Sequence, residues 1–170
     1  GYSDITALHS AIYKNTGLVT FHGPLAISDF VENEVDKFTE DNFFKVIEGK
    51  VEIPHAFENV FEYSCLKPGV VTAKLTGGNL AVLCSLLGTK YFPDIKGKIL
   101  LLEDIGEPLY KIDRLLTQLD LAGIFDFIAG LLVGKFTGIS DKVCQNTSEN
   151  LKDLLNNDEQ EKIAERQAIE

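Results

Sequence analysis

The stretch 97–138 constrains the fold of this chain more than any other part of the sequence. It opens with an apolar run at 99–102, a pattern typical of a strand that is buried on both faces. Residues 109–119 then place leucine and isoleucine at helical spacing, and 131–133 forms a second short apolar run. A strand, a helix and a strand in this order predict a β-α-β unit, which requires a parallel sheet.

Two carboxylates, Glu103 and Asp104, follow the first of these predicted strands directly. Gly106 and Pro108 then supply a turn and a helix start, with Pro108 near the first helical position. In parallel sheets, ligands bind beyond the carboxyl ends of the strands. Glu103 is therefore the first candidate for chemistry.

A second candidate lies at Ser3, ahead of apolar residues at helical spacing, Ile5, Leu8 and Ile12. One interpretation is that Ser3 or Asp4 is the N-cap of this helix, since both residue types are favoured caps. The other is a nucleophile elbow, where a serine on a tight strand-to-helix turn faces solvent and backbone N–H groups beside it bind an oxyanion. The G-x-S-x-G pattern of such elbows is incomplete because Ile5 replaces its second glycine. Both interpretations remain open on the residues alone.

Other segments place further elements around these two candidates. Residues 18–21 predict a strand, and His22 behind it either lines a cleft or caps the strand end. Residues 70–75 alternate like another strand. Asn79 is most simply the N-cap of an apolar, buried helix over 80–87.

The remaining segments give weaker patterns. Residues 28–62 interleave phenylalanine with carboxylates, which favours amphipathic helices around a solvated acidic face. Residues 141–155 have a weak helical pattern, and the polar stretch 156–170 is typical of a frayed helix or a disordered tail.

Composition excludes several classes of function. The net charge of −10 argues against binding to nucleic acid or to anionic membranes, both of which reward clustered lysine and arginine. No apolar run is long enough to span a membrane. Cys65, Cys84 and Cys144 contain no CxxC pair, which favours reduced thiols in a reducing compartment. No His/Cys/carboxylate cluster has ligand spacing, so we expect neither a metal nor an organic cofactor.

Several blocks in the same linear order resemble the LD-carboxypeptidase family of serine peptidases, which includes muramoyltetrapeptide carboxypeptidases and microcin-immunity hydrolases. The blocks are GYSDITALH (1–9), TGLVTFHGP (16–24), LTGGNLAVL (75–83), GKILLLEDIGEPLYKIDRLLTQL (97–119) and AGIFDFIAGLLVGKF (122–136). Their agreement makes the resemblance specific, although no single block would suffice.

The resemblance implies a serine hydrolase with a Ser–Glu–His triad. The nucleophile falls on Ser3, a backbone oxyanion donor on Asp4, and the triad glutamate on Glu103, which would orient the imidazole and stabilise the imidazolium. The implied reaction is hydrolysis of the L,D-amide to the terminal D-alanine of murein tetrapeptide, during cell-wall peptidoglycan recycling in the cytoplasm. The family also implies a homodimer of full-length subunits.

The chain departs from the family pattern at both ends. The family has an α/β portion before the GYSD block and a catalytic histidine beyond the central unit, whereas no histidine follows His55 here. His9 cannot replace it, because a position six residues after Ser3 on one helix lies roughly 9 Å along the axis and on another face. We therefore expect a truncated member that is nearly inactive alone.

The predicted architecture is an incomplete two-part α/β hydrolase. Residues 1–66 are expected to be the C-terminal part of a Rossmann-like nucleophile domain, and 67–155 a partial β/α/β domain with a parallel sheet that carries the triad glutamate. Residues 156–170 form the polar tail. Two alternatives to the carboxypeptidase stand: a microcin-immunity-type amide hydrolase of the same family, and a non-catalytic binding module, which the missing base favours.

Overall fold

The computed structural model describes residues 1–31, 35–51 and 64–139. The chain divides into two compact units, the first made of 1–64 with 77–94 and the second of 65–76 with 95–170. The expected helical pattern at 141–155, the polar tail and His55 lie outside the described residues. The domain limits expected near residues 67 and 155 stay predictions.

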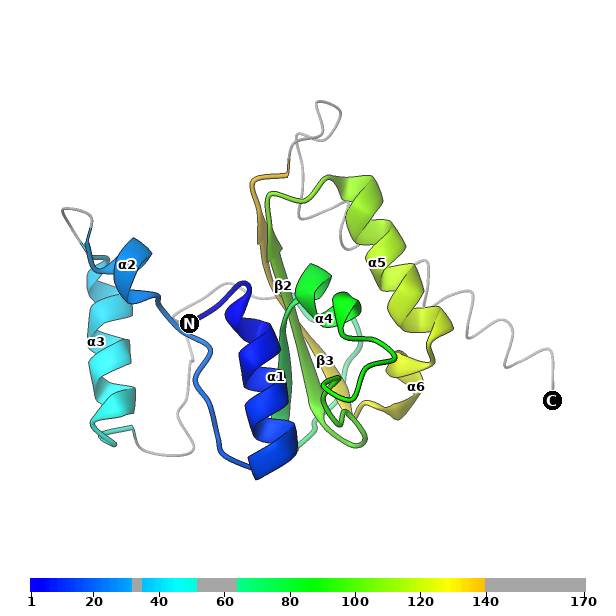
Figure 1. The fold of residues 1–170 in the computed structure, drawn as a ribbon, viewed down its shortest axis with the longest axis horizontal. Helices are drawn as coiled ribbons and strands as arrows, with labels where there is room; N and C mark the ends of the chain where they lie inside the picture. The colour runs from blue at the N-terminus through cyan, green and yellow to red at the C-terminus, as the bar shows by residue number, and fades with distance from the viewer. Residues whose placement is uncertain (32–34, 52–63, 140–170) are drawn as a thin grey trace. The chain divides into compact units, whose positions relative to one another are not determined.

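The second unit contains the β-α-β arrangement (Figure 1). Strand β2 (Ile99–Ile105) leads into helix α5 (Leu109–Leu121) and a short helix α6 (Ile124–Phe127), and the chain returns as β3 (Gly130–Thr137). Strands β2 and β3 pair in parallel. The mixed α/β class and the parallel sheet predicted from the sequence are confirmed.

Alternating burial explains why β2 and α5 form. Leu100 and Leu102 of β2 are 0% and 1% exposed, whereas Leu101 between them is half-buried. Each fully buried leucine contributes about 1.5–3 kcal/mol through the hydrophobic effect. Pro108 is the N-cap of α5, one position before the expected helix start, and its fixed φ suits that place. The helix buries one apolar face, made of Ile112, Leu116 and Leu119.

Among the described residues, the sheet has three strands in the order β1-β2-β3, with β1 at Leu75–Asn79. The expected strand at 70–75 is wrong for most of its length, because the observed strand begins at its last residue. Pairing starts where the N–H of Ile99, the first residue of β2, donates to the carbonyl of Lys74 at 2.9 Å. Alternation of residue types alone does not make a strand.

The first unit contains α1 (Ile5–Thr16), α2 (Ala26–Asp29), α3 (Lys37–Ile47) and α4 (Leu80–Ser85). Helices α1 and α4 contact each other (Figure 1). Helix α1 ends at Gly17, whose φ of 70° is the left-handed conformation that glycine adopts readily.

The strand expected at 18–21 is wrong: this segment has no strand structure. Leu18, Val19 and Phe21 are 63%, 69% and 56% exposed, so their apolar pattern is not buried in a sheet. The amphipathic helix α3 fits the expectation for 28–62, and Asp36 caps it by accepting from the backbone N–H of Thr39 at 2.8 Å. Within the described ranges, no helix is long and apolar enough to cross a membrane.

Candidate active site

The backbone at Ser3 has a conformation that an ordinary side chain rarely adopts. Ser3 has a φ of 56°, and it is the one non-glycine with positive φ among the described residues. Its carbonyl accepts from the backbone N–H of Thr6 at 2.9 Å, so the chain enters α1 at once. Such a conformation costs about 1–3 kcal/mol and tends to occur at functional sites.

The geometry also distinguishes the two interpretations of this turn. Asp4 occupies the N-cap position of α1, but its side chain makes no capping hydrogen bond. Ser3 lies in the left-handed region, whereas an N-cap residue typically has an extended backbone. The turn therefore lacks an ordinary side-chain cap, and the nucleophile elbow stays a prediction.

Gly1 shows why glycine precedes this turn. A Cβ there would lie 2.7 Å from Cδ2 of Leu25 and 2.8 Å from Cγ1 of Ile5, closer than real contacts allow. The Gly1 carbonyl lies 2.9 Å from Nε2 of His9 and also accepts from the N–H of Gly23 at 3.3 Å. His9 thus binds the backbone before the elbow.

His22 lies near His9, with 6.4 Å between the two ring centroids. Burial lowers the pKa of His22, and the neighbouring charge of His9 lowers it further. Because 18–21 is not a strand, the expectation that His22 caps a strand end is wrong; its place in a cleft stays a prediction.

Glu103 lies in β2 opposite an irregularity in β3. Leu102 pairs with Val133 but Asp104 pairs with Phe136, so an extra residue is accommodated in β3 at this point. Such bulges change the direction of side chains and are common beside active sites. A Cβ on Gly134 would lie 3.2 Å from the Cβ of Glu103. The glycine thus gives the Glu103 side chain its room.

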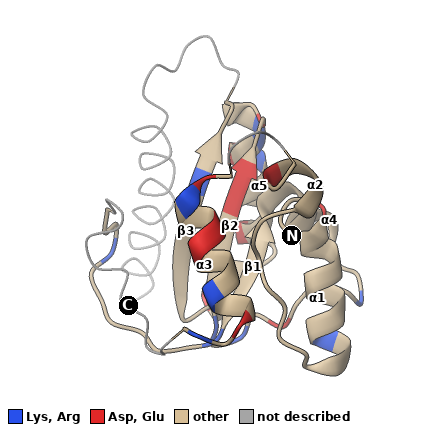
Figure 2. Cartoon of the chain, turned by 90° about the vertical axis from the view of Figure 1, so that its left-hand side faces the viewer, with Lys and Arg blue, Asp and Glu red and all other residues tan. Residues whose placement is uncertain are grey.

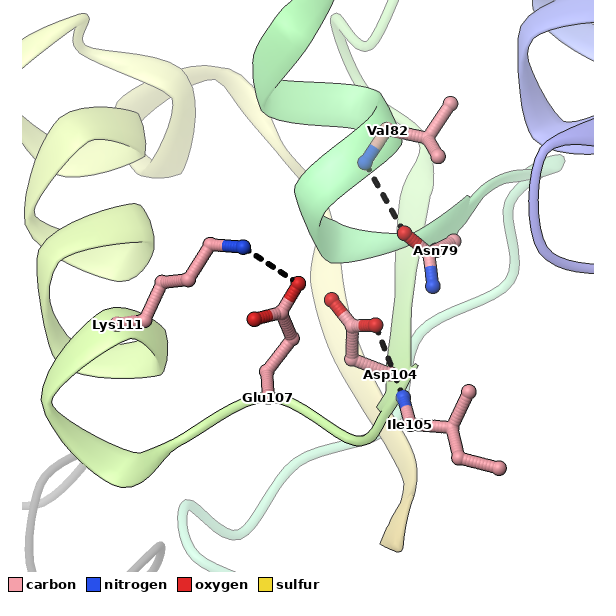
Figure 3. Close-up of polar contacts among 6 residues, drawn as sticks. All are labelled: Asn79, Val82, Asp104, Ile105, Glu107 and Lys111. Carbon is pink, nitrogen blue, oxygen red and sulfur yellow. Dashed lines mark hydrogen bonds and ion pairs between the residues drawn. The ribbon is translucent and has the colours of Figure 1, made fainter. Parts of the chain in front are cut away.

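The carboxylates of β2 form the acidic part of this strand, coloured red in Figure 2. Burial raises the pKa of Glu103, and the negative charge of Asp104 raises it further. Asp104 is buried, and its Oδ1 accepts from the backbone N–H of Ile105 at 2.9 Å (Figure 3). A carboxylate perturbed by desolvation and by a specific neighbour is a candidate for function.

An ion pair follows at the start of α5. Nζ of Lys111 lies 2.7 Å from Oε1 of Glu107 (Figure 3), and this hydrogen bond raises the pKa of Lys111. Because the pair is partly exposed, water screens it and it contributes little to stability. It fixes the Glu107 side chain at the turn between β2 and α5.

The predicted site residues are distributed over both units. Ser3 and Asp4 are adjacent in the first unit, and Glu103 belongs to the second. Their assembly around one cleft, and the oxyanion role of the Asp4 N–H, stay predictions. Among the residues that the structure describes, no group of three or more His, Cys, Asp or Glu side chains is placed to hold a metal ion.

Sequence reasoning missed two residues that lie against the predicted site residues. Thr6 is fully buried, and its Oγ1 accepts from the backbone N–H of Asn79 at 3.0 Å. Gly134 is the other. A glycine within a strand pattern is a known sign of a bulge. The sequence predicted a strand only over 131–133, so Gly134 fell outside it and the bulge was not predicted. The glycines before Asn79 were the signal for a close approach at Thr6.

Comparisons with known proteins assign the family. The LD-carboxypeptidase C-terminal domain matches residues 72–165, and the LD-carboxypeptidase N-terminal domain matches 1–23. A probable murein peptide carboxypeptidase of Bacillus subtilis is 43% identical over 80% of this chain and 42% of its own length. The microcin C7 self-immunity protein MccF of Escherichia coli is 34% identical over 79% of this chain and 46% of its own length.

A solved structure agrees with these matches. The muramoyltetrapeptide carboxypeptidase of Oxalobacter formigenes superposes with a TM-score of 0.71 and 32% identity, covering 91% of this chain and 51% of that one. The chain thus spans about half the length of the relatives it matches. Because the C-terminal domain alone matches more than half of the sequence, the chain belongs to the LD-carboxypeptidase family of serine peptidases.

Proposed function

We propose that this chain carries the nucleophile and the triad glutamate of an LD-carboxypeptidase. Its whole protein would hydrolyse the L,D-amide that joins the terminal D-alanine to the rest of murein tetrapeptide. The observation that carries the proposal is the positive φ of Ser3 at the turn into α1. The relative in Bacillus subtilis, named as a probable murein peptide carboxypeptidase, supports the choice of substrate.

In this proposal, Ser3 Oγ attacks the scissile carbonyl and the C–N bond to D-alanine breaks, leaving an acyl ester that water then hydrolyses. The backbone N–H of Asp4, next to the nucleophile, stabilises the oxyanion of each tetrahedral intermediate. Glu103 accepts a hydrogen bond from the imidazole of the base and stabilises the imidazolium. Its partial burial strengthens that interaction because water screens it less.

The triad histidine is the part that the resemblance does not place on any residue, because no histidine follows His55 in this sequence. His9 is held at the Gly1 carbonyl, and loss of one triad member typically lowers the rate by several orders of magnitude. We therefore propose that the 170 residues alone turn over murein tetrapeptide very slowly.

The test is release of D-alanine from murein tetrapeptide, measured with increasing imidazole as a soluble base. We expect slow release that rises with imidazole in the wild type and is lost in Ser3→Ala. Equal release by both proteins would refute Ser3 as the nucleophile. Fast release by the wild type without imidazole would refute the missing base.

The relationship to MccF favours a second candidate, hydrolysis of an amide in a peptidyl-nucleotide. A solved MccF structure contains aspartyl sulfamoyl adenosine, which makes this compound a suitable competitor. We expect murein tetrapeptide to bind more tightly in calorimetry, in line with the higher identity to the carboxypeptidase. Tighter binding of the nucleotide would favour the immunity-type hydrolase, and tetrapeptide binding with no release under any condition would favour a binding module.

We further propose that the whole protein acts in peptidoglycan recycling in the cytoplasm, as a homodimer. The resemblance to the family and the absence of a CxxC pair support this setting. Light scattering on the full-length protein measures its mass in solution. A monomeric mass at micromolar concentration would refute the homodimer.

A further inference from the structure

We propose that Thr6 is a positioning residue that fixes the Ser3 turn against the segment 77–79, so that the nucleophile and the start of α4 hold one relative position. The inference rests on the proposed role of Ser3 and names a residue that acts through it. All the residues concerned belong to the first unit.

Thr6 makes one hydrogen bond to the Ser3 turn and another to Asn79. It follows Ser3 by three residues, and its backbone N–H donates to the Ser3 carbonyl at 2.9 Å. Its side chain is fully buried, and Oγ1 accepts from the backbone N–H of Asn79 at 3.0 Å, across 73 residues of sequence. One residue therefore joins the strained turn to a segment far away in the chain.

The Thr6 side chain lies in close contact with the backbone of Gly78. A Cβ on Gly78 would lie 2.6 Å from Oγ1 and 3.0 Å from Cγ2 of Thr6. Gly78 also has a φ of 141°, which residues with a Cβ rarely adopt. The glycine thus allows the backbone of the segment to lie directly on the Thr6 side chain.

Asn79 extends the connection into α4. While its backbone N–H donates to Thr6, its Oδ1 accepts from the backbone N–H of Val82 at 3.0 Å (Figure 3). Asn79 is itself 4% exposed. The position of α4 is therefore tied through Asn79 and Thr6 to the conformation of Ser3. A hydroxyl that only filled space would not have to accept the hydrogen bond from the Asn79 N–H.

The test compares Thr6→Val, which keeps the shape and removes the acceptor, with Thr6→Ser, which keeps the hydroxyl. Ser10→Ala is the matched control, because Ser10 is the other buried hydroxyl of α1. NMR spectra of the full chain give the amide exchange rate of Asn79 and the backbone shifts of Ser3. Neither signal depends on turnover, so failure of the proposed function would leave this test intact.

We expect Thr6→Val to raise the exchange rate of the Asn79 amide roughly tenfold or more, since a buried N–H loses its partner, and to shift the Ser3 resonances. Thr6→Ser should preserve both signals, and Ser10→Ala should change neither. Unchanged Ser3 resonances in Thr6→Val would overturn the positioning role. If Thr6→Val does not fold, fast exchange of the Asn79 amide in the wild type would overturn the proposal, and slow exchange with altered Ser3 shifts in Gly78→Ala would support it.

Discussion

Gly78→Ala should destabilise the protein far more than an ordinary glycine-to-alanine substitution. Two independent costs add at this position: a backbone with φ of 141°, and a new methyl group 2.6 Å from Oγ1 of Thr6. Gly88→Ala is the matched control. Gly88 also has positive φ, 76°, but a Cβ there would have no atom within 4 Å.

The magnitude follows from these two terms. Positive φ costs an alanine about 1–3 kcal/mol, and forcing a methyl group into a packed contact costs about 1–3 kcal/mol more. Both variants gain about 0.4–1 kcal/mol from a less flexible unfolded chain, so this term cancels in the comparison. We expect Gly78→Ala to lose about 2–5 kcal/mol in the free energy of unfolding, at least about 1 kcal/mol more than Gly88→Ala.

Urea unfolding followed by circular dichroism measures both variants against the wild type. The slope of the transition should stay the same, so that the midpoints report stability. Equal losses in Gly78→Ala and Gly88→Ala would refute the close contact between Gly78 and Thr6. The link between the Ser3 turn and α4 would then lose its structural basis.

Three further predictions concern the candidate site. Ser3→Gly should unfold at higher urea than Ser3→Ala, by about 1 kcal/mol in free energy, because glycine adopts the positive φ of Ser3 without strain; equal midpoints would show that the turn is unstrained. Gly134→Ala should lose about 1–3 kcal/mol through its contact with Glu103, whereas Gly23→Ala, which meets no atom within 4 Å, should stay within about 1 kcal/mol of the wild type. The pKa of Glu103 is raised in the folded state, so its contribution to stability is present below its ordinary pKa of 4.5 and is lost as pH rises through the folded value. In urea titrations at a series of pH values, Glu103→Gln should therefore gain stability relative to the wild type as pH rises from 4.5, and a constant difference would refute the raised pKa.

The β-α-β unit could be predicted from the sequence because its signals are local. The strand β2 is specified by the apolar run before Glu103. The helix α5 is specified by Pro108 at its start and by the spacing of its leucines. Asn79 as the cap of α4 was equally clear, since a side-chain amide before an apolar helix has a defined partner in the first turn. These predictions are confirmed.

The errors arose where structure depends on distant partners. The segment 18–21 has the composition of a strand, but a strand also requires a ladder of backbone hydrogen bonds, which composition does not encode. Thr6 is separated from Asn79 by 73 residues, so no local pattern reveals their hydrogen bond. The close approach of Gly1 to Leu25 likewise joins residues that are distant in the sequence.

The most direct test of the central claim, that Ser3 is the nucleophile, is mass spectrometry of an acyl intermediate. The protein is incubated with murein tetrapeptide and imidazole, quenched in acid, digested and mapped. The account predicts an ester-linked tripeptide on the fragment that contains Ser3, together with release of D-alanine. Release of D-alanine with the acyl group on any other residue would contradict it.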